Sequence, residues 1–600
     1  MAHFIFVKMR SAQQPNDMLG RLREICRDLT PKSIADVCEN AASEWPAERD
    51  TYYAIQNCRG LSGPESGVLT VGWTMGLEHE TSGQTCGEHA DGSYAIIEAN
   101  GNRVRFFTDQ FGSRTLWFYM DSGMLFISTS QRAVVQLKGC FCPNQASIAW
   151  FLSSGCQGPF ISWDEQIQQV RPEFTYVLEC ETWSMLRSRK TGMNLPASGN
   201  GDLRSYNANF ERYISQAIGK IIRTHGVGEV LLPLSGGLDS RLLLALAHRD
   251  GSGDAVSLVN WGIASEKMAF TDKVAAKRVA EFYGKPILDQ QLPTQTENLD
   301  EMLDLFVEAS EGRLDQFNAY TDGFAMWDSF VRSGYRFVLR GDIPFTEGID
   351  IDDASARAHI GLQMFADYDN KDELGLNGFD ALQRRFDIAR HTDESLIRWR
   401  DRLYVEWRIP MVISAFSDII GRYVENRCPM MSWSLYRQYM ALPDRAKGNK
   451  KHIAGLWKLR DKSGVPSHAI SSLAQPVAYF ETPLGREYLC NRLSRLRGGG
   501  DFPETMLDAV AAHLDRDQTR RLTQAKGAGF KASIRAWLSD RFPNTLKGQI
   551  KAARPRPLEP MVLAYRIVLI DKILCMYRRQ AKLAAPRAIE PKFSLSGTPE

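Results

Sequence analysis

The stretch "EVLLPLSGGLDSRLLLALAHR", residues 229–249, decides the fold of this chain. An apolar, strand-like run leads into a polar turn at 235–240, and a helix-forming run follows at once. A strand, a glycine-rich turn and a helix in this order predict an anion site, because the first amide N–H groups of the helix point outward at the positive end of its dipole. Gly236 and Gly237 let the backbone approach a ligand oxygen without a Cβ clash.

The acid in this turn limits the kinds of anion that the turn could bind. A carboxylate beside a phosphate repels it, so Asp239 indicates a cation between the two, and Mg²⁺ is usually held by carboxylate and phosphate oxygens. Ser235 and Ser240 add hydroxyl donors on either side of the glycines. A turn that only redirected the chain would need neither the acid nor both hydroxyls. We therefore predict a polyphosphate site here, with Asp239 as a Mg²⁺ ligand.

Residues from about 200 to 480 alternate strand-like runs with apolar residues at helical spacing. Alternating strands and helices predict a doubly wound parallel sheet covered on both faces, with a ligand crevice at the carboxyl ends of its strands. The later part of this region is mostly helical in pattern. The expected strands are 229–234, 255–262 and 335–342, and the expected helices are 206–225, 238–249 and 270–284.

Residues 1 to about 190 have a different pattern. Short β-rich runs are separated by the turn pairs Asn100-Gly101, Phe111-Gly112 and Ser122-Gly123, and residues 174–186 add a further strand pair. This pattern predicts antiparallel hairpins. The changes in pattern divide the chain into domains at 1–195, 200–495 and 500–600, the last a helical extension after a run of three glycines.

The overall composition excludes several classes of protein. The net charge of +2 provides no overall positive field that would attract nucleic acid. The 24% of charged and 44% of hydrophobic residues are typical of a soluble globular protein. The 11 scattered cysteines suit a reducing cytoplasm, and Cys140 and Cys142 are interpreted as ordinary thiols. We see neither a signal peptide nor an apolar run of membrane-spanning length, and expect a cytoplasmic location. The basic amphipathic stretch 559–587 could lie on a membrane surface or bind a partner, although packing on its own domain is the favoured interpretation.

The turn at 235–240 lacks the Gly-Lys-Ser/Thr of a Walker loop and resembles the PP-loop, SGG-x-DS, of ATP pyrophosphatases. These enzymes split ATP into AMP and pyrophosphate. The resemblance implies ATP as substrate and Mg²⁺ as cofactor. The ATP-binding residues that it implies are Leu234, Ser235, Gly236, Gly237, Asp239, Ser240, Val259, Arg340 and Gly341.

Other motifs resemble the asparagine synthetases. In residues 108–134, Asp109, Phe111, Gly112, Arg114, Leu116, Tyr119, Phe126 and Ser128 match their class II glutamine amidotransferase domain. Downstream, Glu425, Arg427 and Pro429 match "E-x-R-x-PFLD", and Lys451 in "KKHIAGLWK" matches a family lysine. This resemblance implies an α+β, Ntn-hydrolase-like sandwich followed by an α/β doubly wound domain of the adenine nucleotide α-hydrolase type and a helical C-terminal part.

Two departures from that family change the expected reaction. Ala2 stands where the glutamine-using members have their cysteine nucleophile, so we expect a degenerate amidotransferase domain without glutaminase activity. The third strand is followed by "RGDIPFTE", residues 340–347, where the family has "SGEG-x-DE". Asp342 could act there as a base or a metal ligand, and Glu347 could replace the missing acid as a metal ligand.

Members with such departures resemble amide-forming cyclases, and this chain is most similar to the lasso-peptide macrolactam cyclases. The resemblance implies that an Asp or Glu side chain of a precursor peptide is adenylated and that the N-terminal amine of the peptide closes an isopeptide ring. Lys451 would stabilise the tetrahedral intermediate, and Asp342 or Glu406 would be the base. A leader-peptide-processing protease is the implied partner, and no nucleic acid is expected.

Three alternatives stay open at this stage. The first is an asparagine synthetase-like enzyme that uses free ammonia, and the second is a β-lactam synthetase-like enzyme acting on a small amino acid. The third is a non-catalytic scaffold that binds ATP and partner proteins. The intact turn at 235–240 argues against the scaffold, which would not need it.

Overall fold

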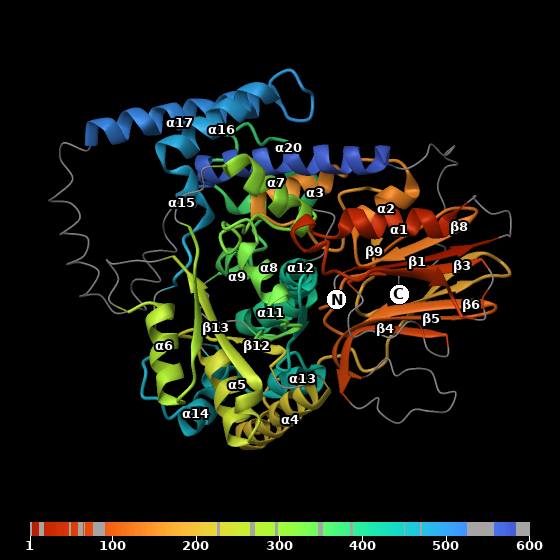
Figure 1. Cartoon of the computed structure of the whole chain (residues 1–600). Helices are drawn as coiled ribbons and strands as arrows, with labels where there is room; N and C mark the ends of the chain where they lie inside the picture. The colour runs from red at the N-terminus through yellow and green to blue at the C-terminus, as the bar shows by residue number, and fades with distance from the viewer. Residues whose placement is uncertain are drawn as a thin grey trace.

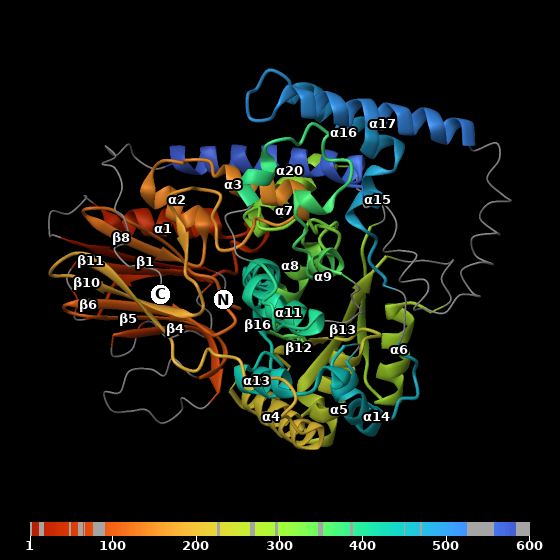
Figure 2. The ribbon, with the colours of Figure 1, turned by 180° about the vertical axis from the view of Figure 1, so that it is seen from behind.

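In the computed structural model the described part of the chain forms three β-sheets surrounded by helices (Figures 1 and 2). Two sheets are antiparallel and belong to the first 190 residues, and the third is parallel. The fold is therefore mixed α/β, with the antiparallel part first in the chain, as the sequence predicts. The structure describes residues 3–10, 17–46, 48, 50–57, 64, 67–75, 90–224, 228–263, 270–293, 298–345, 352–383, 388–448, 450–467, 471–524 and 557–583, with side chains up to 515 in the last segment but one.

The N-terminal part is a sandwich of the two antiparallel sheets. Their facing sides share one apolar core, in which Phe106 stacks on Tyr176 with ring centroids 5.4 Å apart. The predicted hairpin turns are confirmed at Asn100-Gly101 and Ser122-Gly123, where Gly101 has a φ of 49°. The first sheet has the order β2 (Ala41–Glu44), β3 (Thr51–Gln56), β1 (His3–Met9), β8 (Met124–Ser128), β7 (Trp117–Met120), β9 (Gln168–Gln169), and the second the order β11 (Ser184–Arg189), β10 (Phe174–Glu179), β6 (Arg103–Thr108), β5 (Asp91–Asn100), β4 (Val68–Met75).

The parallel sheet has the strand order β14 (Ile287–Gln291), β13 (Val256–Gly262), β12 (Val230–Pro233), β15 (Phe337–Leu339), β16 (Glu425–Arg427). The chain moves outward from β12 first in one direction and then in the other. The direction of winding therefore reverses between β12 and β15, and ligands of such sheets bind at the carboxyl ends of the strands beside this switch point.

Helices cover both faces of the parallel sheet, as predicted. Alternate strand residues divide between two apolar cores: Leu232 packs with one layer of helices and Leu231 with the other. The first layer is α4 (Leu203–Thr224), α5 (Leu238–Arg249), α6 (Asp272–Phe282), α13 (Trp433–Ala441) and α14 (Lys451–Arg460), and the second includes α7 (Leu299–Ser310), α8 (Ala325–Arg332) and α12 (Ser414–Gly421).

The second core continues into the N-terminal part, where α1 (Met18–Leu29), α2 (Gln131–Lys138) and α3 (Gln145–Ser154) cover the outer face of the first antiparallel sheet. The remaining elements are η1 (Lys32–Ile34), η2 (Gly253–Ala255), α9 (Asp353–Ile360), η3 (Phe365–Asp367), α10 (Phe379–Gln383), α11 (Leu396–Leu403), the π-helical η4 (Tyr404–Ile413), η5 (Asp444–Ala446), α15 (Pro476–Phe480), α16 (Pro483–Leu496) and α17 (Glu504–Gln524).

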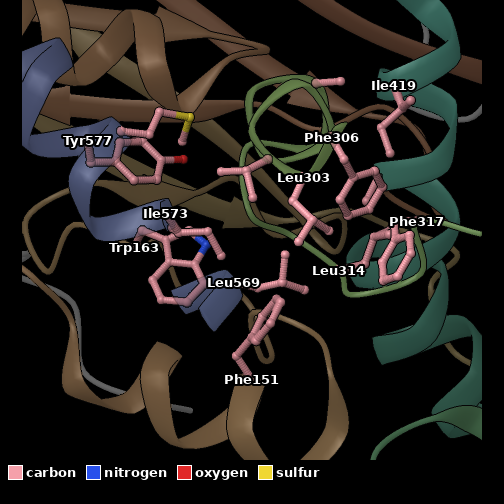
Figure 3. Close-up of a cluster of buried hydrophobic side chains, with 14 of the residues drawn as sticks. Phe151, Trp163, Leu303, Phe306, Leu314, Phe317, Ile419, Leu569, Ile573 and Tyr577 are labelled. Carbon is pink, nitrogen blue, oxygen red and sulfur yellow. The ribbon is translucent and has the colours of Figure 1, made fainter. Parts of the chain in front are cut away.

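The basic C-terminal stretch is helix α20 (Pro560–Lys582), which lies across α2, α3 and α7 (Figure 1). Its cations pair with acids of the same chain: Arg566 with Asp315 at 2.8 Å and Lys572 with Asp304 at 2.7 Å. This helix therefore packs on its own protein, and its apolar side is not presented to a membrane or a partner. Figure 3 shows its side chains Leu569, Ile573 and Tyr577 in a cluster with Phe151, Trp163, Leu303, Phe306, Leu314, Phe317 and Ile419.

Within the described residues, no helix combines the length and apolar character needed to cross a bilayer. The described cysteines are all free thiols, Cys140 and Cys142 among them.

Candidate functional site

The glycine-rich turn at 235–240 lies directly after β12, at the switch point of the parallel sheet. Ser240 holds the turn closed, because its hydroxyl accepts the amide N–H of Ser235 at 3.1 Å and lies 3.2 Å from the Ser235 hydroxyl. The Ser235 hydroxyl in turn accepts the amide of Gly237 at 3.1 Å. Gly237 then caps α5 without a side-chain hydrogen bond. The two serines thus order the turn as well as supplying hydroxyl groups.

The loop after β15 comes into close contact with this turn. A Cβ atom on Gly341 would stand 2.9 Å from the Cβ of Asp239 and 3.2 Å from the amide nitrogen of Ser240. Only glycine allows that approach. The predicted ATP-binding residues from the two loops are therefore neighbours, and Val259 joins them through its carbonyl, which accepts the amide of Leu234 at 2.8 Å.

Lys450, at the start of α14, extends its side chain to the turn. Its Nζ lies 2.5 Å from Oδ2 of Asp239, and the residue is 7% exposed. Lys451, which the sequence comparison selected, is exposed on the first turn of α14. The structure therefore places Lys450 and not Lys451 at the turn, and the role of a lysine in the reaction stays a prediction. The physical reason is the backbone: Lys450 has a φ of 56°, a left-handed conformation that turns its side chain inward.

Asp342 lies in the same neighbourhood. Its Oδ1 accepts a hydrogen bond from Arg340 at 3.0 Å, and its Oδ2 accepts one from the thiol of Cys428 at 3.4 Å, just beyond β16. Burial, with the nearby Asp342 carboxylate, raises the pKa of Cys428 well above its usual value, so this thiol stays protonated and donates. Asp342 is thus placed at the carboxyl edge of the sheet, and its role as a base remains a prediction.

Two other predicted residues are not brought into this group. Glu406 lies in the π-helical segment η4, where its half-exposed side chain pairs with Arg402 at 2.8 Å. No contact in the described part of the chain joins Glu406 to the turn at 235–240, so the structure does not place it as a base there. Side chains on the wide turns of a π-helix point in other directions than they would on an α-helix. The sequence pattern does not reveal that this segment is π-helical. Glu347 lies outside the described residues.

Two polar residues at this edge were not predicted from the sequence. Oδ1 of Asp272, the first residue of α6, accepts the amide of Gly236 at 3.2 Å. Asn260, near the end of β13, donates its side-chain amide to the carbonyl of Leu234, which leaves its buried Oδ1 without a hydrogen-bond partner among the described residues. An acid at the start of the helix that follows the second strand was the available signal for Asp272.

The motif at 109–114 forms a joint between the two parts of the molecule. The buried ion pair of Arg114 with Glu425 links the motif to β16, and Arg114 also donates to the carbonyl of Asn426 at 3.1 Å. Burial alone would raise the pKa of Glu425, but nearby positive charges, among them the guanidinium groups of Arg114 and Arg427, overcome this and lower it to about 2. Two sequence motifs more than 300 residues apart are therefore in direct contact.

Comparisons with known proteins give little beyond this geometry. No family model matches the chain, and no curated protein matches it. Among solved structures it is similar to one titled "Structure of the allosteric regulatory enzyme of purine biosynthesis", with 9% sequence identity, a TM-score of 0.22, and coverage of 66% of this chain and 93% of that one. A likeness at that TM-score does not favour any one function.

The edge of the parallel sheet thus brings together backbone N–H groups of a glycine-rich turn, the carboxylates of Asp239 and Asp272, and the ammonium of Lys450. Amide and ammonium donors bind anionic oxygens, while the carboxylates bind cations. An arrangement of this kind can bind a metal-complexed polyphosphate and stabilise negative charge that forms during a reaction.

Proposed function

We propose that this protein is an ATP-dependent, AMP-forming carbon–nitrogen ligase that closes a macrolactam ring in a peptide. The observation that carries the proposal is the convergence of the turn at 235–240, Gly341 and Lys450 at the switch point of a parallel sheet. A phosphate chain lying on the turn would place its α-phosphorus between the two loops, where a carboxylate can attack it.

The residues present fit Mg²⁺ as the cofactor. Mg²⁺ prefers one or two carboxylates together with substrate phosphate oxygens, and Asp239 offers such a carboxylate in the first turn of α5. When bound, the cation would neutralise charge on the leaving pyrophosphate. The turn itself would hold the phosphate oxygens through the amide groups of Gly236 and Gly237 and the hydroxyl of Ser235.

In the first half-reaction, an oxygen of an Asp or Glu side chain in the peptide attacks the α-phosphorus of ATP. The bond between that phosphorus and the bridging oxygen breaks, pyrophosphate leaves, and an acyl-adenylate remains. The protein's contribution is to hold the attacking oxygen and the phosphorus in line and to stabilise the negative charge that develops on pyrophosphate.

In the second half-reaction, the N-terminal amine of the peptide attacks the acyl carbon and AMP leaves. The amine must lose a proton, and Asp342, at the carboxyl edge of the sheet, would accept it directly or through a water molecule. Lys450 takes the role first assigned to Lys451, because its ammonium lies at the turn and can stabilise the tetrahedral oxygen.

The N-terminal part supports a cyclase over a glutamine-using enzyme. Its amidotransferase-like motif is used as a buried joint: Arg114 pairs with Glu425, and a Cβ on Gly112 would stand 3.2 Å from Pro410 in η4. These contacts give the motif a structural role that does not need glutamine. An amine within the peptide substrate then supplies the nitrogen.

The proposal is tested by incubating the protein with ATP, Mg²⁺ and a library of linear peptides, each with a free N-terminal amine and one internal Asp or Glu. We expect AMP and pyrophosphate as products and a peptide lighter by one water, measured by mass spectrometry. Formation of ADP would contradict the proposal. Pyrophosphate release that requires free aspartate and ammonia, with no peptide dehydrated, would instead favour the asparagine synthetase-like alternative.

A further inference from the structure

The turn at 235–240 already has a carboxylate bound to it. Oδ1 of Asp272 accepts the amide N–H of Gly236 at 3.2 Å, and this amide is one of those that would otherwise bind a phosphate oxygen. Thr271 caps α6 by accepting the amide of Val274, which fixes Asp272 at the start of that helix. The acid is thus held at the turn by an element other than the turn itself.

The carboxylate of Asp272 is held by backbone N–H groups rather than by a cation of the described residues. In the described ranges no lysine or arginine forms an ion pair with it, although Lys273 beside it pairs with Asp289 at 2.7 Å. Burial raises the pKa of Asp272, while hydrogen bonds from the backbone of Gly236 and Ser472 oppose that rise. A phosphate chain that approaches Gly236 therefore meets a carboxylate oxygen that already accepts this amide.

We propose that Asp272 is a built-in competitor of the polyphosphate and that a divalent cation relieves the competition. The carboxylate occupies the Gly236 amide when no nucleotide is bound. A polyphosphate without a metal must displace it against charge repulsion, whereas a metal-complexed polyphosphate carries a cation that can bind the carboxylate together with the phosphate oxygens. The protein thereby selects the metal complex over the free anion. This inference rests on the proposed function, because it takes the turn as the polyphosphate site.

An Asp272→Asn variant distinguishes the effect of the negative charge from the effect of the hydrogen bond to Gly236. In Asp272→Asn the amide oxygen can still accept the Gly236 N–H, so the turn keeps its hydrogen bond and loses only the negative charge. A matched control is Asp254→Asn, which removes the same charge from a fully exposed acid on η2, whose nearest described partner is Lys285 at 3.6 Å. Thermal unfolding of both variants shows whether they remain folded.

The experiment is calorimetric titration of pyrophosphate into the full chain, once with a chelator and once with Mg²⁺. The wild-type protein should bind pyrophosphate about tenfold or more tightly with Mg²⁺ than without it. Asp272→Asn should bind metal-free pyrophosphate about tenfold more tightly than the wild type, with a correspondingly smaller gain from Mg²⁺. Asp254→Asn should match the wild type in both conditions.

Metal-free affinity in Asp272→Asn that equals or falls below that of the wild type would overturn the inference, since the carboxylate would then only order the turn. An equal rise in Asp254→Asn would also overturn it, because the effect would be one of overall charge. If the wild type binds no pyrophosphate with or without Mg²⁺, the proposed function itself fails, which is a different result from an unchanged Asp272→Asn.

Discussion

The turns at 109–114 and 235–240 are made of similar residues and behave differently. Each follows a strand and contains glycine, serine and one aspartate. In the first turn, Asp109 is fully buried and accepts backbone amides of its own turn, including those of Phe111 at 2.9 Å and Ser113 at 3.2 Å. In the second, Asp239 reaches out to Lys450, which belongs to a distant part of the chain.

This difference separates a structural turn from a binding turn. In the first turn, Asp109 accepts the hydroxyl of Ser113 and the amide of Arg114, and Arg114 pairs with Glu425, so its charged groups are bound within the protein. The second turn is completed by one acid, Asp272, and one lysine, Lys450, from other elements, and both are charged groups that a metal-complexed polyphosphate can replace. The composition of a turn alone would not have distinguished the two.

The largest expected effect is at Asp239. An Asp239→Ala variant should lower pyrophosphate release by a factor of about a thousand or more, because the turn loses its only acid for the metal. The measurement is coupled detection of pyrophosphate, with circular dichroism to show that the variant is folded. Asp254→Ala serves as the control. Turnover near the wild-type rate would remove the turn from the reaction.

The corresponding change in the other turn should affect stability instead. Asp109→Ala leaves several buried amide donors without an acceptor, which should cost on the order of 4 kcal/mol of unfolding free energy. Urea unfolding measures this loss, and nucleotide affinity of the folded protein should stay the same. Weakened nucleotide binding at unchanged stability would show that the comparison of the two turns is wrong.

The two adjacent lysines give an internal comparison. Lys450→Ala should slow ring closure by about a hundredfold, since an ammonium at the turn is lost, whereas Lys451→Ala should stay within about twofold. Lys450→Arg should not restore the rate, because a planar guanidinium does not replace a compact ammonium. The rate of peptide dehydration, followed by mass spectrometry, shows which of the two lysines the reaction needs. The reverse pattern would return the role to Lys451.

The smallest effect is expected at Glu406. Its partner is Arg402 at a half-exposed site, so Glu406→Gln should change stability by less than about 1 kcal/mol and the cyclisation rate by only a few-fold. A pH–rate profile of the variant provides the check. A hundredfold loss of rate together with a displaced acidic limb would restore Glu406 as the base and extend the site to η4.

The elements of the parallel sheet could be predicted because they depend on local patterns. The apolar run before Ser235 is β12, the helical spacing within 270–284 is α6, and Gly284 just beyond it has the φ of 63° expected of a helix stop. The hairpins at Asn100-Gly101 and Ser122-Gly123 followed in the same way from turn pairs, whereas Phe111-Gly112 proved to connect strands of two different sheets, β6 and β7. These features depend on residues within a few positions of one another.

The details of the site depend on contacts that no local pattern encodes. Lys450 and Lys451 are chemically the same, but Lys450, with a left-handed backbone, pairs with Asp239, whereas Lys451 is exposed. Asp272 meets Gly236 because α6 begins beside the turn, 36 positions further along the chain. Glu406 lies in a π-helical segment whose geometry redirects its side chain. Such residues are found only when the elements have been placed in space.

The most direct test of the central claim is a crystal structure of the protein with Mg²⁺ and an ATP analogue whose α–β bridge is a methylene group. We predict that the phosphates lie against Gly236 and Gly237 and that Lys450 contacts a phosphate oxygen. The adenine ring should lie on the side of β13, near Asn260. A nucleotide bound elsewhere, with the Asp239–Lys450 pair and the Asp272–Gly236 bond unchanged, would contradict the claim that this turn is the ATP site.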